Sequence, residues 1–165
     1  MSELIIIGYD DHSIAEQAQA RAVAMQRDLI LDIAGIATVE VDLDGKKHVH
    51  TPGSVVGSGA ASGALWGTII GLFFLNPAVG MLIGGAWGAV LGRLAKSGLN
   101  HEFRSRVDGL LAPGKSGLVL MTRKITEDKF AAGMAEFGGT ILRSSLSDKD
   151  EKELAEMLGV PQDIQ

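Results

Sequence analysis

Hydrophobic positions in the first fifty residues follow a strand-helix-strand pattern. Leu4–Gly8 is an apolar run rich in branched residues, which indicates a buried strand. Ser13 with Glu16 three residues later is a capping-box pattern, and it predicts an alanine-rich helix that runs to about Arg27. Ile36–Leu43 alternates apolar and polar residues, as a strand with one solvated face does. Together these segments predict one β-α-β unit.

A hairpin and a short amphipathic helix flank the middle of the chain. Asp44-Gly45 is a two-residue hairpin signal, so Lys46–His50 is expected to fold back as a short strand. Beyond the middle, apolar residues at helical spacing predict a short helix close to the apolar middle of the chain, ended by Pro113-Gly114. These apolar residues are Phe103, Val107, Leu110 and Leu111.

The last third of the chain repeats the pattern of the first. Gly117–Met121 is a second apolar strand. Thr126 is expected to cap a helix that runs to about Phe137 and is stopped by Gly138-Gly139. A strand of mixed polarity and an acidic terminal helix follow, at Thr140–Leu146 and Ser147–Leu158.

The order strand-helix-strand, insert, strand-helix-strand predicts an α+β fold of ferredoxin-like topology, with both helices on one sheet face. Leu4–Gly8 and Gly117–Met121 are apolar on both faces, as central strands are. Thr38–Leu43 and Thr140–Leu146 alternate, as edge strands do. Residues 1–52 plus 98–165 would form this soluble domain, and residues 53–97 a glycine-rich insert.

The insert carries no charged residue before Arg93, because none occurs between Lys47 and Arg93. Its pattern predicts two apolar helices, Ser54–Leu75 and Ala78–Ala95, joined at Asn76-Pro77. Glycine recurs at every fourth position on each helix, and the two series mirror each other about the turn. The first series is Gly59, Gly63, Gly67 and Gly71, and the second is Gly80, Gly84, Gly88 and Gly92.

Each series occupies one helix face, because residues four apart lie above one another on a helix. A glycine inside a helix costs roughly 1 kcal/mol relative to alanine in water, so eight in register need a reason. Close contact between helices is that reason in small-xxx-small interfaces of membranes. The eight glycines are therefore predicted to be helix-packing residues of a glycine-zipper hairpin.

The hairpin is expected to enter a lipid bilayer and to associate with copies of itself. Its first helix spans about the thickness of the hydrocarbon core. Basic residues gather at the open end of the hairpin, which places the α+β part in the cytoplasm beside the inner membrane. These residues are Lys46, Lys47, Arg93, Lys96, Arg104 and Arg106.

Two alternatives to a membrane hairpin stay open. Trp66 and Trp87 lie near the middle of the predicted helices, where an interfacial aromatic belt would not put them. A soluble homo-oligomer could instead pack its hairpins into a shared core, and a monomer could bury its own hairpin. A lone exposed hairpin is excluded, because its apolar surface far exceeds the patches that soluble monomers expose.

Composition narrows the possible partners. The net charge of -5 argues against nucleic acid. The absence of cysteine excludes disulfides and thiolate metal sites. The N-terminus, Met1-Ser2-Glu3-Leu4-Ile5, lacks the basic and long apolar regions of a signal peptide.

Few residues carry candidate chemistry. His48 and His50 are two apart in a predicted strand and share a face, but the sequence places no third metal ligand beside them. Asp10, Asp11 and His12 lie in a loop after a central strand, a position that could bind a cation or a small ligand. A solvated turn that helps to cap the next helix is the simpler interpretation. No phosphate-binding motif or activated nucleophile is present. We therefore predict no enzymatic activity, catalytic residue, cofactor or metal.

Nearly the whole chain resembles a bacterial family of predicted membrane proteins catalogued as domain of unknown function 1269. The resemblance implies membrane association and a soluble α+β part, but no reaction. It rests on four segments: Leu4-Ile5-Ile6-Ile7-Gly8-Tyr9-Asp10-Asp11, Trp66-Gly67, Phe73-Phe74-Leu75-Asn76-Pro77, and Gly138-Gly139 through Leu142-Arg143-Ser144-Ser145-Leu146. Two functions are compatible with it: a self-associating structural membrane protein, or a regulatory module that binds a small ligand.

Overall fold

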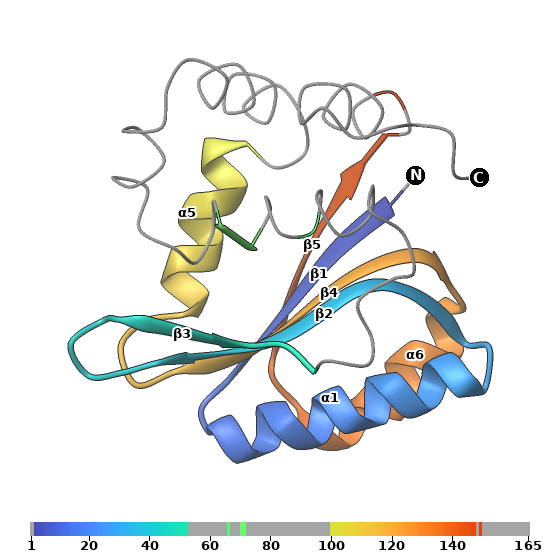
Figure 1. The fold of residues 1–165 in the computed structure, drawn as a ribbon, viewed down its shortest axis with the longest axis horizontal. Helices are drawn as coiled ribbons and strands as arrows, with labels where there is room; N and C mark the ends of the chain where they lie inside the picture. Colours follow the sequence, from blue (N-terminus) through green and yellow to red (C-terminus); the bar gives the residue numbers. More distant parts are fainter. Residues whose placement is uncertain (1, 53–65, 67–69, 72–99, 148, 150–165) are drawn as a thin grey trace.

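The computed structural model describes residues 2–52, 66, 70–71, 100–147 and 149. Within these residues, five strands form one antiparallel sheet in the order β3-β2-β4-β1-β5, and the helices α1, α5 and α6 pack around it (Figure 1). The elements are β1 Ser2–Tyr9, α1 His12–Arg27, β2 Leu31–Val41, β3 Lys47–His50, α5 His101–Leu110, β4 Ser116–Ile125, α6 Glu127–Met134, a 3-10 turn Ala135–Phe137 and β5 Thr140–Leu146.

β1 and β4 are inner strands of the sheet, as the sequence predicts. β1 pairs with β4 on one side and with β5 on the other, and Ile6 stands opposite Val119 and Leu142. β5 is an edge strand, as expected. β2 is not, because β3 folds back along its outer side and becomes the other edge. The prediction of Thr38–Leu43 as an edge strand was therefore wrong.

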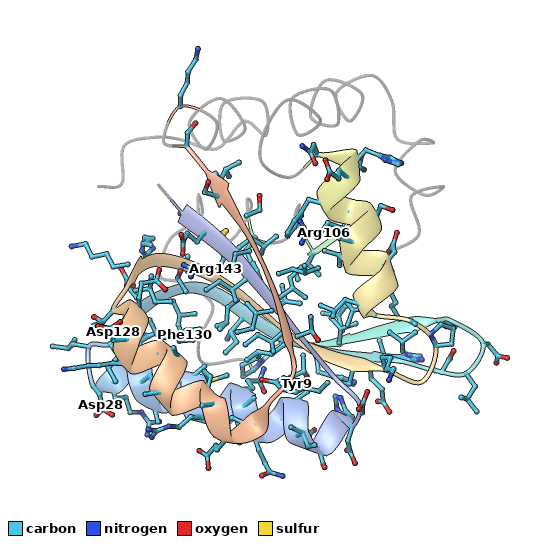
Figure 2. The ribbon with its side chains drawn as sticks, turned by 180° about the vertical axis from the view of Figure 1, so that it is seen from behind. Tyr9, Asp28, Arg106, Asp128, Phe130 and Arg143 are labelled. Carbon is cyan, nitrogen blue, oxygen red and sulfur yellow. The ribbon has the colours of Figure 1, made fainter. Side chains whose placement is uncertain are left out.

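One face of the sheet is covered by α1 and α6 (Figure 1). α1 presents a row of small residues, Ala15, Ala18 and Ala22, which are fully buried and let the helix lie close to the strands. Phe130 of α6 fills the space beside them (Figure 2). This half of the core agrees with the predicted layer of two helices.

Tyr9 closes this core at the end of β1 (Figure 2). Its hydroxyl is buried and has no hydrogen-bond partner among the described residues. Burial disfavours the phenolate and raises the pKa of Tyr9 to about 12, so the side chain stays neutral at physiological pH.

The opposite face is covered by α5 together with Trp66 and Ile70, two residues of the predicted insert. Gly8 and Gly117 are cross-strand partners under the end of α5. A β-carbon at Gly8 would lie 2.6 Å from Leu110, and one at Gly117 would lie 2.7 Å from Leu111. The missing side chains therefore allow α5 to approach the two central strands closely.

The helix start and the second strand differ from the sequence prediction. Asp11, not Ser13, caps α1: its carboxylate accepts a hydrogen bond from the Ser13 amide at 2.7 Å. This bond and the Ser13 hydroxyl lower the pKa of Asp11. β2 begins at Leu31, five residues earlier than expected, because its register with β4 shifts around Ile33 and disguises the alternation.

The connection between β2 and β3 is one residue longer than the sequence predicts. The Asp42 carboxylate accepts hydrogen bonds from the amides of Asp44 and Lys46, and Gly45 adopts a φ of 84°. These contacts favour a three-residue connection with glycine in the left-handed position over the two-residue turn expected at Asp44-Gly45. The change shifts the strand register, so that Thr38 faces His50.

The second half follows the prediction more closely. α5 begins after Asn100, whose side chain accepts a hydrogen bond from the Phe103 amide at 3.0 Å. Thr126 precedes α6 as expected, although its side chain makes no capping hydrogen bond. Gly138 and Gly139 have φ values of 64° and 90°, a backbone conformation that suits glycine and ends the helical segment.

The predicted hairpin Ser54–Leu75 and Ala78–Ala95 lies outside the described residues, except for Trp66, Ile70 and Gly71, which are helical. The predicted terminal helix Ser147–Leu158 lies outside them as well, except for Ser147 and Lys149. Within the described part of the chain, no helix is long and apolar enough to cross a membrane.

Arg143 ties the edge strand β5 to its surroundings (Figure 2). Its guanidinium donates to both carboxylate oxygens of Glu127, at 2.8 and 2.6 Å, and to Glu3 at 2.6 Å. The hydrogen bonds from Arg143 are the main reason that the pKa of Glu127 lies below its usual 4.5. The network links α6, β1 and β5, although its exposed charges contribute modestly to stability.

We predict that Arg143→Gln weakens the acid dependence of stability. A carboxylate with a depressed pKa in the folded state stabilises the protein above its unfolded pKa, and this contribution is lost as the pH falls through the folded value. Without Arg143, the free energy of unfolding should be lower at neutral pH and should fall less between about pH 5 and pH 3. Urea unfolding across this range measures both effects.

The control for this prediction is the same substitution in a Glu127→Gln background. There the guanidinium has lost its main carboxylate partner, so Arg143→Gln should change the acid dependence much less. An equal change in both backgrounds would show that Glu127 is not the group responsible.

Candidate functional site

The glycines predicted to pack the hairpin helices are largely outside the described residues. This applies to seven of them: Gly59, Gly63, Gly67, Gly80, Gly84, Gly88 and Gly92. Gly71 is described and helical, and a β-carbon added there would meet no described atom within 4 Å. The face of this helix that carries Gly71 is therefore not packed against the described part of the protein.

Trp66 joins the insert to the sheet. Its side chain is only 4% exposed and lies against Gly35 of β2. A β-carbon at Gly35 would lie 2.2 Å from Cδ2 of the indole, so the ring occupies the volume that any other residue would fill. Glycine inside a strand often marks such a close approach. Gly35 therefore forms a seat for Trp66.

The contact between insert and sheet extends beyond this seat. Ile70, one helical turn after Trp66, is 9% exposed and belongs to the same apolar cluster as Phe103 and Val107 of α5. Trp66 and Ile70 are four residues apart, so they share one face of the helix. Gly71 follows Ile70 by one residue and thus lies about 100° around the helix. The sheet contact and Gly71, the described member of the predicted glycine series, therefore lie on different faces.

The seat is apolar throughout. The indole Nε1 of Trp66 is buried and has no hydrogen-bond partner among the described residues. An unpaired buried donor costs free energy. No hydrogen bond to a described residue positions the ring. Shape and apolar contact therefore account for the location of Trp66.

A polar cluster lies on the other face of the sheet, at the start of α1. The side chains of His12, Glu40 and His50 each offer a ligand atom, and these atoms lie within 4.8 Å of one another. The imidazole rings of His12 and His50 are tilted, with their centroids 5.4 Å apart. His12 is half-buried, whereas Glu40 and His50 are exposed. The three residues come from α1, β2 and β3.

Ser116 fixes the orientation of His12. Its hydroxyl is buried and donates to the carbonyl oxygen of Val39 at 2.7 Å. Nδ1 of His12 lies 3.0 Å from Oγ of Ser116. Because a serine hydroxyl has one hydrogen, the bond to Val39 leaves Ser116 an acceptor for His12, so Nδ1 carries the hydrogen. In the neutral ring, Nε2 then holds the lone pair.

The other polar residues predicted near this site have separate partners. Asp10 forms an ion pair with Lys115, and Asp11 caps α1. His48 lies 3.3 Å from Asp42, whose pKa is lowered mainly by the hydrogen bond from the Lys46 amide. His48 and His50 therefore share one face of β3, as predicted, but His48 lies beside Asp42 and His50 beside His12.

The sequence analysis missed this cluster because it depends on the hairpin register. With a two-residue turn at Asp44-Gly45, His50 would have stood opposite Val39, whose side chain lies in the core on the α5 face. The observed register places it opposite Thr38, on the face that carries Glu40 and α1. The two signals that could have indicated this are Asp42, which can accept amides of the turn, and Gly45 in the left-handed position.

Comparison with known protein families gives a match. A family model described as protein of unknown function (DUF1269) matches residues 60–159, which is more than half of the chain. The chain belongs to the DUF1269 family. No curated protein and no solved structure matches it.

Membership in DUF1269 confirms the family resemblance inferred from the sequence. The match covers most of the predicted insert, α5, β4, α6 and β5, and it begins after β3. Trp66 therefore lies inside the matched region, whereas its seat at Gly35 and the three residues of the polar cluster lie outside it. The family description carries no activity, so bacterial origin and membrane association stay predictions.

We predict that Gly35→Ala destabilises the protein by about 1–3 kcal/mol, because the new methyl group overlaps the indole of Trp66. Trp66→Ala should cost about 3–5 kcal/mol through the lost apolar contact. In the double variant the alanine methyl meets no ring, so the two effects should not add. Urea unfolding of the four proteins measures the coupling.

Gly109→Ala is the matched control. Gly109 lies in α5, and a β-carbon there meets no described atom within 4 Å. Alanine is the better helix former, so this change should leave stability equal or raise it by up to about 1 kcal/mol. Additive effects of Gly35→Ala and Trp66→Ala would show that the seat does not hold the ring.

Proposed function

We propose that the protein is a structural, self-associating protein whose apolar insert docks on its own α+β domain and meets other copies through the glycine series. The contact of Trp66 with Gly35 carries this proposal, because it gives the insert a fixed attachment on the sheet. We further propose that the α+β domain is ferredoxin-like; the strand order and the two β-α-β units support this.

The arrangement of the insert helix supports self-association. Trp66 and Ile70 use one face of this helix for the sheet, whereas Gly71 lies on another face with no described neighbour. The fourfold spacing in the sequence predicts that Gly59, Gly63 and Gly67 share the face of Gly71. That face is suited to a second helix, because small residues permit close contact between backbones. The partner proposed here is a second copy of this chain.

A membrane protein is the second candidate function. The charge-free stretch between Lys47 and Arg93 favours it. In that form the hairpin would lie in the inner membrane, with the α+β domain on the cytoplasmic side as the basic residues at its open end indicate. A residue packed on a sheet cannot face lipid at the same time, so the membrane form requires Trp66 to leave Gly35. Neither candidate assigns a reaction or a cofactor.

The environment of Trp66 distinguishes the two candidates. The chain contains only two tryptophans, so Trp87→Phe leaves Trp66 as the single indole. With the protein prepared in lipid vesicles, we expect its fluorescence to be shielded both from acrylamide in water and from brominated acyl chains. The protein should also leave membranes in alkaline carbonate.

Gly35→Ala in the same single-tryptophan background provides the control, since it displaces the ring from its seat. Quenching should then increase. If brominated lipid strongly quenches Trp66 fluorescence in the protein that retains Gly35, and the protein resists extraction by carbonate, the membrane form is favoured over the docked form.

Self-association through the glycine series has its own test. Gly67→Leu and Gly84→Leu should each reduce the assembly size measured by light scattering, because bulk at a close helix contact costs about 1–3 kcal/mol. Ile69→Leu is the matched control, since it nearly conserves volume. An assembly size that stays the same with leucine at either position would show that the glycines serve another purpose.

A further inference from the structure

We propose that His12, Glu40 and His50 form a binding site for a divalent transition-metal ion, with zinc as the best match. Two imidazoles and one carboxylate are a recurrent zinc donor set with a fourth position left open. Imidazole ligands select transition metals over magnesium and calcium, which prefer oxygen. The three ligand atoms come from three different elements and converge within 4.8 Å.

The separation of the ligand atoms suits a shared ion better than direct contacts. In the described part of the chain, the side chains of Glu40 and His50 make no hydrogen bond or ion pair with another residue. Ligands at about 2.0–2.1 Å from a tetrahedral zinc ion stand roughly 3.3 Å apart. Side-chain movements on the order of 1 Å therefore convert the cluster into a coordination shell. Exposure of Glu40 and His50 permits this movement.

Ser116 provides the outer contact that metal-binding histidines need. A ligating histidine almost always donates its second ring hydrogen to a fixed acceptor, which sets its tautomer and ring orientation. Here Ser116 accepts from Nδ1 of His12 and is itself anchored to Val39. Nε2 is then the nitrogen that is available to the ion. A solvated surface histidine would not require this buried, directional arrangement.

A further carboxylate lies close to the same nitrogen. Glu16 is one helical turn after His12, and its Oε1 lies 3.4 Å from Nε2. Its side chain is 63% exposed, so it can rotate away from the imidazole or towards the ion. Glu16 or a water molecule can therefore fill the fourth position. Together with Glu40, it gives the site the negative charge that favours a cation.

Metal binding would also link α1 to β3. His50 is the last residue of β3, and the insert begins three residues later at Gly53. His12 is the first residue of α1. An ion held by both would fix the end of the edge strand β3 to the helix and thereby restrain the start of the insert. The site thus adds a ligand-dependent restraint to the proposed assembly without depending on self-association.

Zinc titration of the full chain, followed by calorimetry, tests the site. We expect one ion per chain and a large loss of affinity in His50→Ala and in Glu40→Gln. His48→Ala is the matched control, because it removes the other exposed histidine of the same strand face, which pairs with Asp42. Its affinity should equal that of the unchanged protein. An equal loss in His48→Ala and His50→Ala would overturn the site in favour of non-specific surface binding.

Two further measurements separate coordination from a purely structural role. Cobalt should give the strong visible absorption of a four- or five-coordinate ion. Ser116→Ala should weaken zinc binding by about 10–100-fold through loss of the orienting contact, and by less than His50→Ala does. A cobalt spectrum like that of the aqueous ion, or full affinity in Ser116→Ala, would contradict the proposed coordination through Nε2.

Hydrogen exchange detects the restraint on β3. Zinc should slow exchange of the Lys47–His50 amides in the unchanged protein and in His48→Ala, but not in Glu40→Gln, which retains the size of the side chain. Circular dichroism verifies that each variant is folded. Exchange that is unaffected by zinc in the unchanged protein would refute the link between α1 and β3.

Discussion

The structure depends on the need to cover both faces of its central strands. β1 and β4 are apolar on both sides, so the sheet cannot leave either face in water. α1 and α6 cover one face, whereas on the other α5 is the only helix of the α+β part among the described residues (Figure 1). Trp66 and Ile70 of the insert belong to this second core. The insert is thus part of the packing of the domain, at least at these two positions.

Unbroken apolar runs were sufficient to locate β1 and β4, because a strand buried on both faces needs no alternation. The seat at Gly35 was not foreseen, although a glycine inside a strand is itself a signal of close approach. What approaches cannot be deduced from Gly35 alone, since Trp66 is distant in sequence. The early start of β2 was hidden for a related reason: its register shift around Ile33 disrupts the period on which the prediction relied.

The polar cluster shows how a local change determines which residues meet. The sequence analysis considered His50 as a metal ligand, but as a partner of His48. The side chain of Asp42 and the conformation of Gly45 then set the register of β3, and a shift of one residue exchanges the two faces of a strand. His12 was assigned to a solvated turn, but Ser116, in a strand formed much later in the chain, holds it in place.

The strand order also has a consequence for synthesis of the chain. Both neighbours of β1 in the sheet, β4 and β5, follow the insert in sequence, and β4 separates β1 from β2. A nascent chain that has emerged only as far as the insert therefore lacks β4, the strand that pairs with β2 at Gly35. Long-range strand pairing of this kind is slow to form. During translation the apolar segment must persist without its binding surface until β4 has been made, which is a period when chaperones or a membrane can compete for it.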